Sequence, residues 1–159
     1  MAAVEQTVAT FGPVTVLVNN IGNAYFRLGR FEEAITHFER ADAIWSSLGR
    51  SRSTDALNTL NNWASAQYRS GRIEPAVELF ERALDLRREL YGPSAAMAAL
   101  LNNLGKALLK LDRHGEAIEL LRRLRNRRPG DSRVAALLAE ALLRRGDVGE
   151  ARATLALSP

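Results

Sequence analysis

The sequence contains no cysteine, which excludes disulfide bonds and thiolate metal ligands and fits a reducing compartment. Histidine is nearly as scarce, because His37 and His114 are the only two. The sequence shows no recurring pairing of a nucleophilic residue with a general base, and no recurring spacing typical of metal ligands. We therefore expect a protein that is not an enzyme and that needs no metal or other cofactor.

Long apolar runs are also missing. The chain has no stretch of about 18 uncharged apolar residues, so we expect no transmembrane helix and no membrane partner. The N-terminus lacks the basic start and apolar run of a secretory signal. These absences predict a cytoplasmic protein. Lysine is rare, since all of the 22 basic residues except Lys106 and Lys110 are arginines, and heavy use of Arg, Ala and Leu suggests a bacterial source.

What the sequence does contain is a repeated helical pattern in a chain of 159 residues, enough for one domain with a core. The stretch Leu60–Ala83 resembles Val18–Ala41, Leu101–Leu124 and, less closely, Ala135–Leu157. One alanine sets the register of each copy, at spacings of 42, 41 and 34 residues: Ala34, Ala76, Ala117 and Ala151. A small residue stands twelve positions before each alanine, where two helices would cross closely: Gly22, Ala64, Gly105 and Ala139. Each copy therefore predicts a helix–turn–helix unit.

Turn and cap residues support the same division. A residue suited to positive φ ends the first helix of each copy: Gly29, Gly71, Asp112 and Gly146. Ser53 or Thr54 and the stretch Gly130–Ser132 provide N-caps, and Gly92–Ser94 is a turn followed by a cap. We expect four helix pairs: 14–28 with 31–48, 54–70 with 73–91, 94–111 with 114–128, and 131–145 with 148–157.

These repeated residues resemble the tetratricopeptide repeat family. The long repeats, with LNN in the first helix and FERAL in the second, are similar to those of kinesin light chains and of bacterial signalling regulators. The resemblance implies an all-α fold, a right-handed superhelical solenoid of about four repeats that holds a peptide or helix in its concave groove. It places the repeats at about 14–53, 54–93, 94–130 and 131–159. The tryptophan common early in the family's first helix is absent.

The N-terminal segment, residues 1–13, is predicted to be a capping helix or a linker. Its helical composition extends to Phe11 and is expected to stop at Gly12-Pro13. Val14–Val18 alone has the β-branched pattern of a strand, but we predict a helix because the patterns that follow are helical. Residues 2–22 also resemble a helix–strand–NNAG segment of short-chain dehydrogenases. That family's Tyr-x-x-x-Lys pair and Gly-rich loop are missing, so a dehydrogenase relic is a third hypothesis.

The first helices of three copies share a polar stripe at i, i+4 and i+8. The members of this stripe are the candidate peptide-binding residues: Asn19, Asn23 and Arg27; Asn61, Ser65 and Arg69; Asn102, Lys106 and Lys110. An Asn amide can donate and accept at once, so it suits a ligand backbone. The alternative is that these amides bond a neighbouring helix, which we favour for the second asparagine of each pair: Asn20, Asn62 and Asn103.

Cations end the first helices and predict attraction of an acidic peptide, although cations also suit any helix C-terminus. The arginine run at 122–128 lacks a recognition motif, so a solvated helix end is favoured over a nucleic-acid contact.

The leading interpretation is a protein- or peptide-binding scaffold, and the alternative is an oligomerisation or structural module of a larger bacterial regulator. The C-terminal end supports the alternative. We expect Val148, Ala151 and Leu155 to pack on the third pair, and Leu143 and Leu157 to lack partners. We predict that a second chain or further downstream repeats cover this end, and a homodimer through it is the simplest closed form.

Overall fold

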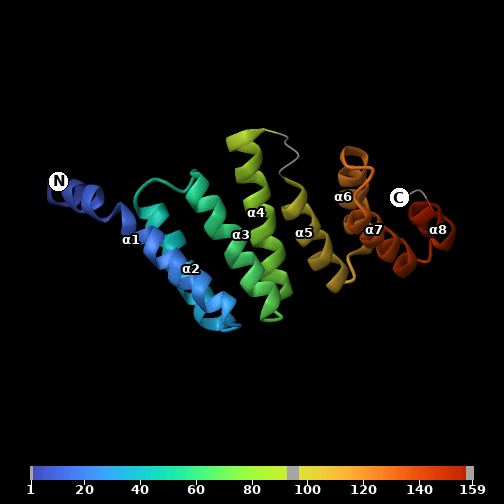
Figure 1. The fold of residues 1–159 in the computed structure, drawn as a ribbon, viewed down its shortest axis with the longest axis horizontal. Helices are drawn as coiled ribbons and strands as arrows, with labels where there is room; N and C mark the ends of the chain where they lie inside the picture. Colours follow the sequence, from blue (N-terminus) through green and yellow to red (C-terminus); the bar gives the residue numbers. More distant parts are fainter. Residues whose placement is uncertain (1, 93–96, 157–159) are drawn as a thin grey trace. The chain divides into compact units, whose positions relative to one another are not determined.

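The computed structural model describes residues 2–92 and 97–156, with side chains from residue 14 onward. These ranges form eight α-helices and contain no strand, which confirms the all-α helical-repeat fold (Figure 1). The helices are α1 (Ala2–Arg27), α2 (Phe31–Ser47), α3 (Thr54–Arg69), α4 (Ile73–Tyr91), α5 (Ala98–Lys110), α6 (His114–Arg127), α7 (Ser132–Arg145) and α8 (Val148–Ala156). The chain divides into two compact units, an N-terminal unit of Met1–Leu90 and a C-terminal unit of Tyr91–Pro159.

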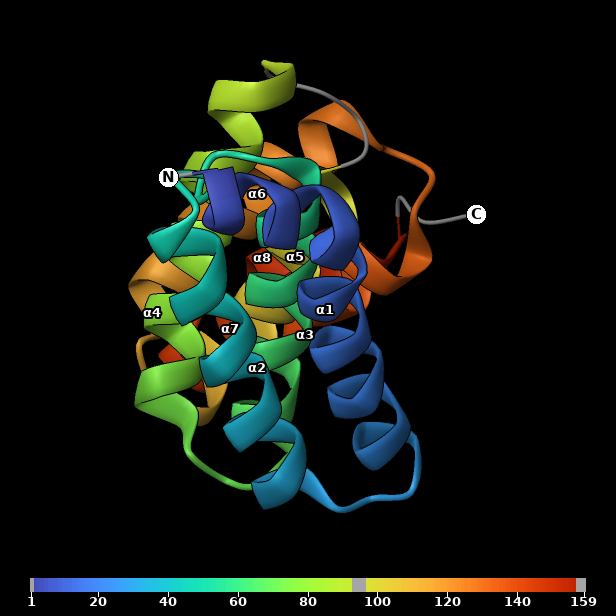
Figure 2. The same ribbon diagram turned by 90° about the vertical axis from the view of Figure 1, so that its left-hand side faces the viewer.

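The first helix pair shows why the repeat needs small residues. In the N-terminal unit α1 and α2 run in opposite directions and are joined by a short turn (Figure 2). Ala34 and Phe38 of α2 are fully buried. A Cβ atom on Gly22 of α1 would lie 2.7 Å from Cε1 of Phe38, so only glycine allows this ring to pack against α1. The predicted close crossing is confirmed.

The C-terminal unit repeats the arrangement with an aliphatic side chain. Ala117 and Leu121 of α6 are fully buried, and a Cβ atom on Gly105 would lie 3.1 Å from Cδ2 of Leu121. A leucine methyl group can move more easily than an aromatic ring, so this crossing is less restrictive than the one at Gly22.

The last helix departs from the expected packing. Val148 and Leu155 of α8 are 48% and 49% exposed, so the expectation that both pack on the third pair is wrong. Ala151 and Thr154 are buried instead. α8 packs on α7, and this contact does not bury Val148 and Leu155. Leu143 is 50% exposed, as expected, and Leu157 lies outside the described residues.

The turn and cap predictions are confirmed where the structure describes them. The residues at the turns have φ values of 75°, 88°, 56° and 97°: Gly29, Gly71, Asp112 and Gly146. Ser53 caps α3 by accepting a hydrogen bond of 3.1 Å from the backbone N–H of Ala56. Asp131 caps α7 through the backbone N–H of Arg133, also at 3.1 Å.

The N-terminal half of α1 differs from one predicted helix boundary. α1 continues through Gly12 and Pro13, so the helix end expected there is wrong. The helix across Val14–Val18 is confirmed, because α1 packs along α2 and contacts α3, and these contacts outweigh the local strand preference. The proposed turn and cap at Pro93–Ser94, and the start of the third first helix at 94, lie outside the described residues.

Candidate functional site

A pair of asparagines joins the first helices of the N-terminal unit. The side-chain nitrogen of Asn62 on α3 donates a 2.9 Å hydrogen bond to Oδ1 of Asn23 on α1. Both side chains are half-buried. The amide nitrogen of Asn23 and the amide oxygen of Asn62 have no partner among the described residues. The pair therefore presents one donor and one acceptor from two adjacent helices.

Asn19 belongs to a second link between helices. The indole nitrogen of Trp45 on α2 donates to the hydroxyl of Thr59 on α3 at 3.2 Å, and that hydroxyl lies 3.3 Å from Oδ1 of Asn19 on α1. Thr59 and Trp45 are buried. The Thr59 hydroxyl also lies 3.0 Å from the Asp55 carbonyl, so its single proton serves one acceptor at a time. Thr59 thus links α3 to α2 and lies beside Asn19 of α1, and Asn19 contacts a neighbouring helix, as in the structural alternative for such amides.

The remaining polar residues of α3 are placed differently. The Ser65 hydroxyl donates to the Asn61 backbone carbonyl at 2.8 Å, within the same helix. The Asn61 side chain is half-buried and has no partner among the residues that the structure describes. Asn62, which we predicted to bond a neighbouring helix, does so. The sequence could not show that Asn62 would contact Asn23 of the predicted stripe.

The cations that end the first helices divide into two groups. Arg69 lies over the Phe31 ring at 5.3 Å, and Arg144 donates to the Leu109 carbonyl at 3.3 Å and to Glu140 at 2.8 Å. These two stabilise helix packing. Arg27 and Lys110 are exposed. Lys106, one turn before the end of α5, is also exposed, and neither Arg27 nor Lys106 forms an ion pair with any described residue.

Another set of arginines stands three residues after the cations that end the first helices. These arginines form ion pairs at the starts of the second helices. Arg30 bonds Glu33, Arg113 bonds Glu116, and Arg72 bonds Glu32 of the preceding pair. The hydrogen bonds from Arg30 and Arg113 hold the pKa values of Glu33 and Glu116 below their usual range.

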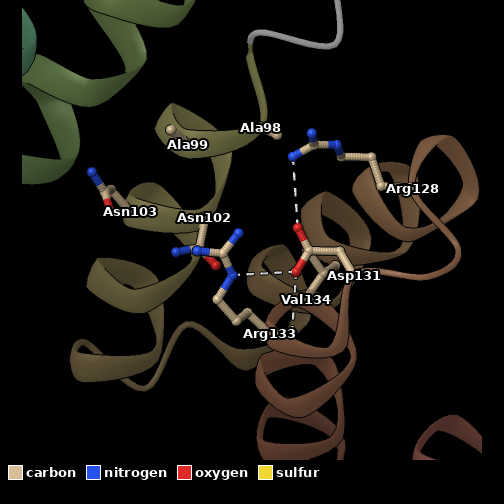
Figure 3. Close-up of a pocket in the computed structure, with 8 residues that line it drawn as sticks. All are labelled: Ala98, Ala99, Asn102, Asn103, Arg128, Asp131, Arg133 and Val134. Atoms are coloured by element: carbon tan, nitrogen blue, oxygen red, sulfur yellow. Dashed lines mark hydrogen bonds and ion pairs between the residues drawn. The ribbon is translucent and has the colours of Figure 1, made fainter. Parts of the chain in front are cut away.

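A pocket of about 240 Å³ lies in the C-terminal unit, between the start of α5 and the connection from α6 to α7. Polar residues from both sides line it: Asn102, Asn103, Arg128, Asp131 and Arg133. The guanidinium groups of Arg128 and Arg133 approach the two carboxylate oxygens of Asp131 at 3.6 and 3.4 Å (Figure 3). The oxygen Oδ1 of Asn102 is buried and has no hydrogen-bond partner among the described residues. Such an acceptor favours a ligand that brings an N–H group.

Asp131 sets the charge of this pocket. Burial alone would raise the pKa of its carboxyl, but hydrogen bonds from the Arg133 side chain and backbone outweigh burial and lower the pKa. The ionised carboxylate neutralises much of the charge of Arg128 and Arg133. Asn102 was a candidate from the sequence, but the pocket was missed, because Arg128 was assigned to a solvated helix end and Asp131 to a helix cap.

Other candidates have structural surroundings. His37 of α2 is half-buried and stacks on Tyr25 of α1, with ring centroids 5.3 Å apart. In the arginine run, Arg122 forms a 2.6 Å bond to Glu150 of α8. The described residues contain no cluster of His, Asp and Glu that could hold a metal ion. Within the described part of the chain, no helix is both long and apolar enough to span a bilayer.

The chain belongs to the tetratricopeptide repeat family. One tetratricopeptide repeat model matches residues 14–89 and again 55–130, and a second matches 108–159. A comparison with curated proteins finds no match. The dehydrogenase resemblance of residues 2–22 finds no support, because α1 is helical where that segment requires a strand.

Solved structures with similar folds include BtubC (BKLC) from P. vanneervenii, with a TM-score of 0.82 and 25% identity over 89% of this chain. This chain spans 60% of that protein's length. A putative kinesin light chain from Podosopora anserina has a TM-score of 0.73 and 23% identity, over 87% of this chain and 70% of that one. YrrB, a TPR protein with an unusual peptide-binding site, has a TM-score of 0.72 and 19% identity, over 96% and 71%. The last two likenesses show the fold alone.

Proposed function

We propose that this chain is a scaffold that binds a protein or peptide along a groove lined by the first helices, and that it is not an enzyme. Membership of the tetratricopeptide repeat family supports a general role in protein–protein interaction. The observation that carries the proposal is the Asn23–Asn62 pair. Its unused amide nitrogen and oxygen match the carbonyl and N–H groups of an extended peptide backbone.

The pocket of the C-terminal unit supports the same proposal. The buried Asn102 oxygen lacks a donor, and an unsatisfied buried acceptor costs roughly 1–3 kcal/mol. A peptide N–H that enters the pocket would remove this cost. The unusual peptide-binding site of YrrB adds support from a protein of similar fold.

The ligand is proposed to be acidic. The exposed cation Lys106 lies one turn after Asn102 on α5, and Lys110 lies one turn further. Their positive potential would attract a peptide rich in Glu or Asp. The proposed contact residues remain those of the polar stripe: Asn19, Asn23, Arg27, Asn61, Ser65, Arg69, Asn102, Lys106 and Lys110. Asn19, Ser65 and Arg69 already have partners within the chain and are the weakest of these.

Binding can be tested with three fluorescein-labelled peptide libraries of equal length, one rich in Glu, one neutral and one rich in Lys. Fluorescence anisotropy should show binding of the Glu-rich library, with weakening as salt rises. The double variant Asn23→Ala/Asn102→Ala should lose roughly tenfold in affinity or more, as expected when about 1.4 kcal/mol is removed.

Lys106→Gln should weaken binding of the Glu-rich library alone. Arg40→Gln is the matched control, because Arg40 is an exposed cation of α2 with no ion pair among the described residues. Equal binding by the double variant and the wild type would assign the asparagines to packing. Equal affinity for all three libraries would rule out an acidic ligand.

A second candidate function is assembly, as an oligomerisation or structural module of a larger bacterial regulator in the cytoplasm. The exposure of Leu143, Val148 and Leu155 at the C-terminal end favours it. A homodimer through this end would bury these three side chains.

A further inference from the structure

The α2–α3 interface shows what normally covers the end of a helix pair. Phe38 of α2 forms a core with Ala66 of α3, and Phe26 and Trp63 pack against it. Phe31 contacts Phe26 edge-on, with ring centroids 5.6 Å apart, and Arg69 of α3 lies over the Phe31 ring. The apolar face formed by α1 and α2 of the first pair therefore contacts an alanine and an arginine of α3, the first helix of the next pair.

The C-terminal unit makes the same interface between α6 and α7. In the repeat register, Leu109 and Leu121 replace Phe26 and Phe38, and both are buried. Ala141 of α7 replaces Ala66 and is fully buried. Arg144 replaces Arg69 and also reaches back to the preceding pair, at the Leu109 carbonyl. The interface is thus made twice with the same arrangement of small and cationic residues.

At the C-terminal end the apolar half of this interface is uncovered. Leu143, Val148 and Leu155 occupy the register positions of Phe26, Phe31 and Phe38, and we call them the C-terminal face. Their side chains are 50%, 48% and 49% exposed, whereas Phe38 and its equivalent Leu121 are fully buried. Among the described residues, no first helix covers this face as one covers its counterparts.

The N-terminal end exposes the complementary half. Ile21, Ala24 and Arg27 of α1 occupy the register positions of Trp63, Ala66 and Arg69, and we call them the N-terminal face. Ala24 is exposed, although its equivalents Ala66 and Ala141 are fully buried. Arg27 has no partner among the described residues, although Arg69 and Arg144 each reach a preceding pair.

We propose that the C-terminal face of one copy docks on the N-terminal face of a second copy and reproduces the α2–α3 interface between chains. The occupant is a second copy because one chain carries both halves of an interface that it already makes twice internally. Ala24 would sit against Leu155 as Ala66 sits against Phe38. Arg27 would gain a preceding pair to contact, and in this role it leaves the set of groove candidates.

This inference rests on the assembly candidate and specifies its geometry. In the proposed contact α8 takes the place of α2, and α1 of the second copy takes the place of α3. α8 has nine residues and α2 has seventeen, so α8 reaches only the C-terminal half of that α1. A head-to-tail contact is heterologous, so each docked copy keeps one free face of each kind. Association should therefore pass the dimer as concentration rises, whereas pairing of two C-terminal faces would stop there.

Sedimentation velocity over a concentration series can test this with one variant on each face. Ala24→Glu should abolish association through the N-terminal face, and Leu155→Glu through the C-terminal face, so each variant alone should remain monomeric. An equimolar mixture retains one good face of each kind and should form a heterodimer and nothing larger. Circular dichroism should show unchanged helicity, because both positions are exposed in the free chain.

Val16→Glu is the matched control on α1. Val16 is 42% exposed, but its register equivalents Asn58 and Arg133 are exposed as well, so this position belongs to neither face. The control should associate like the wild type. A monomeric wild type at every concentration would overturn both the assembly candidate and this inference. If Leu155→Glu alone lost association, while Ala24→Glu still formed a dimer and the mixture held no complex between the two variants, paired C-terminal faces would be supported and head-to-tail docking overturned.

Discussion

The two units build the same repeat from different side chains. Every Phe and Trp of the sequence precedes residue 91, and Tyr91 is the last aromatic residue. Phe38, Trp45 and Phe80 are the largest fully buried side chains of the N-terminal unit. Aliphatic residues such as Ile118, Leu121 and Leu142 are the largest fully buried side chains of the C-terminal unit, and Leu121 stands at the register position of Phe38. The difference shows that the repeat fixes where small residues must stand and leaves the large partner variable.

The polar links between helices differ in the same way. In the N-terminal unit, the buried hydroxyl of Thr59 connects α2 and α3 and lies beside Asn19 of α1. In the C-terminal unit, exposed ion pairs take this role, as between Arg122 of α6 and Glu150 of α8. Buried polar links depend on exact partners, whereas exposed ion pairs contribute little each. The N-terminal unit should therefore be the more sensitive to single substitutions.

The largest expected effect comes from truncating the matched core positions. Phe38→Ala should cost about 3–5 kcal/mol of unfolding free energy and Leu121→Ala about 2–5 kcal/mol, because each leaves a cavity. Trp45 and Trp63 both lie in the N-terminal unit, so tryptophan fluorescence reports that unit alone. Circular dichroism reports the helices of both.

In urea, Phe38→Ala should lower the fluorescence midpoint, and Leu121→Ala should lower only the circular dichroism transition. Coincident shifts of both signals in both variants would show that the chain unfolds as one cooperative body. In that case the units differ in composition and not in stability.

The second expected effect concerns the buried hydroxyl. Thr59→Val removes the acceptor of the Trp45 indole N–H and should cost about 1–3 kcal/mol. Thr36→Val is the matched control, because the Thr36 hydroxyl is exposed and bonds only the Glu32 carbonyl one turn back. Urea unfolding followed by fluorescence measures both. If the two variants lose the same amount, the link from α2 to α3 adds nothing beyond the bond within the helix.

The smallest expected effect tests the ion pairs of the C-terminal unit. The pKa of Asp131 is lowered in the folded state, so its contribution is present above the unfolded value of about 3.9 and is lost as pH falls through the folded pKa. Asp131→Asn keeps a capping side chain and removes the charge. Its cost at neutral pH should stay below about 1 kcal/mol, as for exposed ion pairs. Thermal unfolding between neutral and acidic pH should show the variant and the wild type converging in acid. A constant difference across this range would mean that the charge is not the source of the effect.

Much of the fold could be predicted because its signals are local. The close crossings follow from small residues at fixed spacing, and the turns from glycine or Asp112 at positive φ. The helix end expected at Gly12-Pro13 was wrong for the same reason. A local signal of helix termination was present there, but α1 continues along α2.

The candidate site was predictable only in outline. The sequence favoured Asn62 as the amide that meets a neighbouring helix, but it could not name the partner, because the partner lies on another helix. The structure bonds Asn62 to Asn23, and the two residues are 39 positions apart. The pocket at Asn102 was missed because its other walls come from the connection between α6 and α7.

By itself, the sequence determined the repeat register, the helix pairs, the turns and the family, because each depends on residue size or φ preference within one or two helical turns. Only the tertiary structure decided which polar groups are paired and which faces are open. Leu155 and Leu121 occupy the same register position, yet one is half-exposed and the other fully buried. Burial depends on whether a following helix covers the side chain, and the side chain's own repeat does not carry that information.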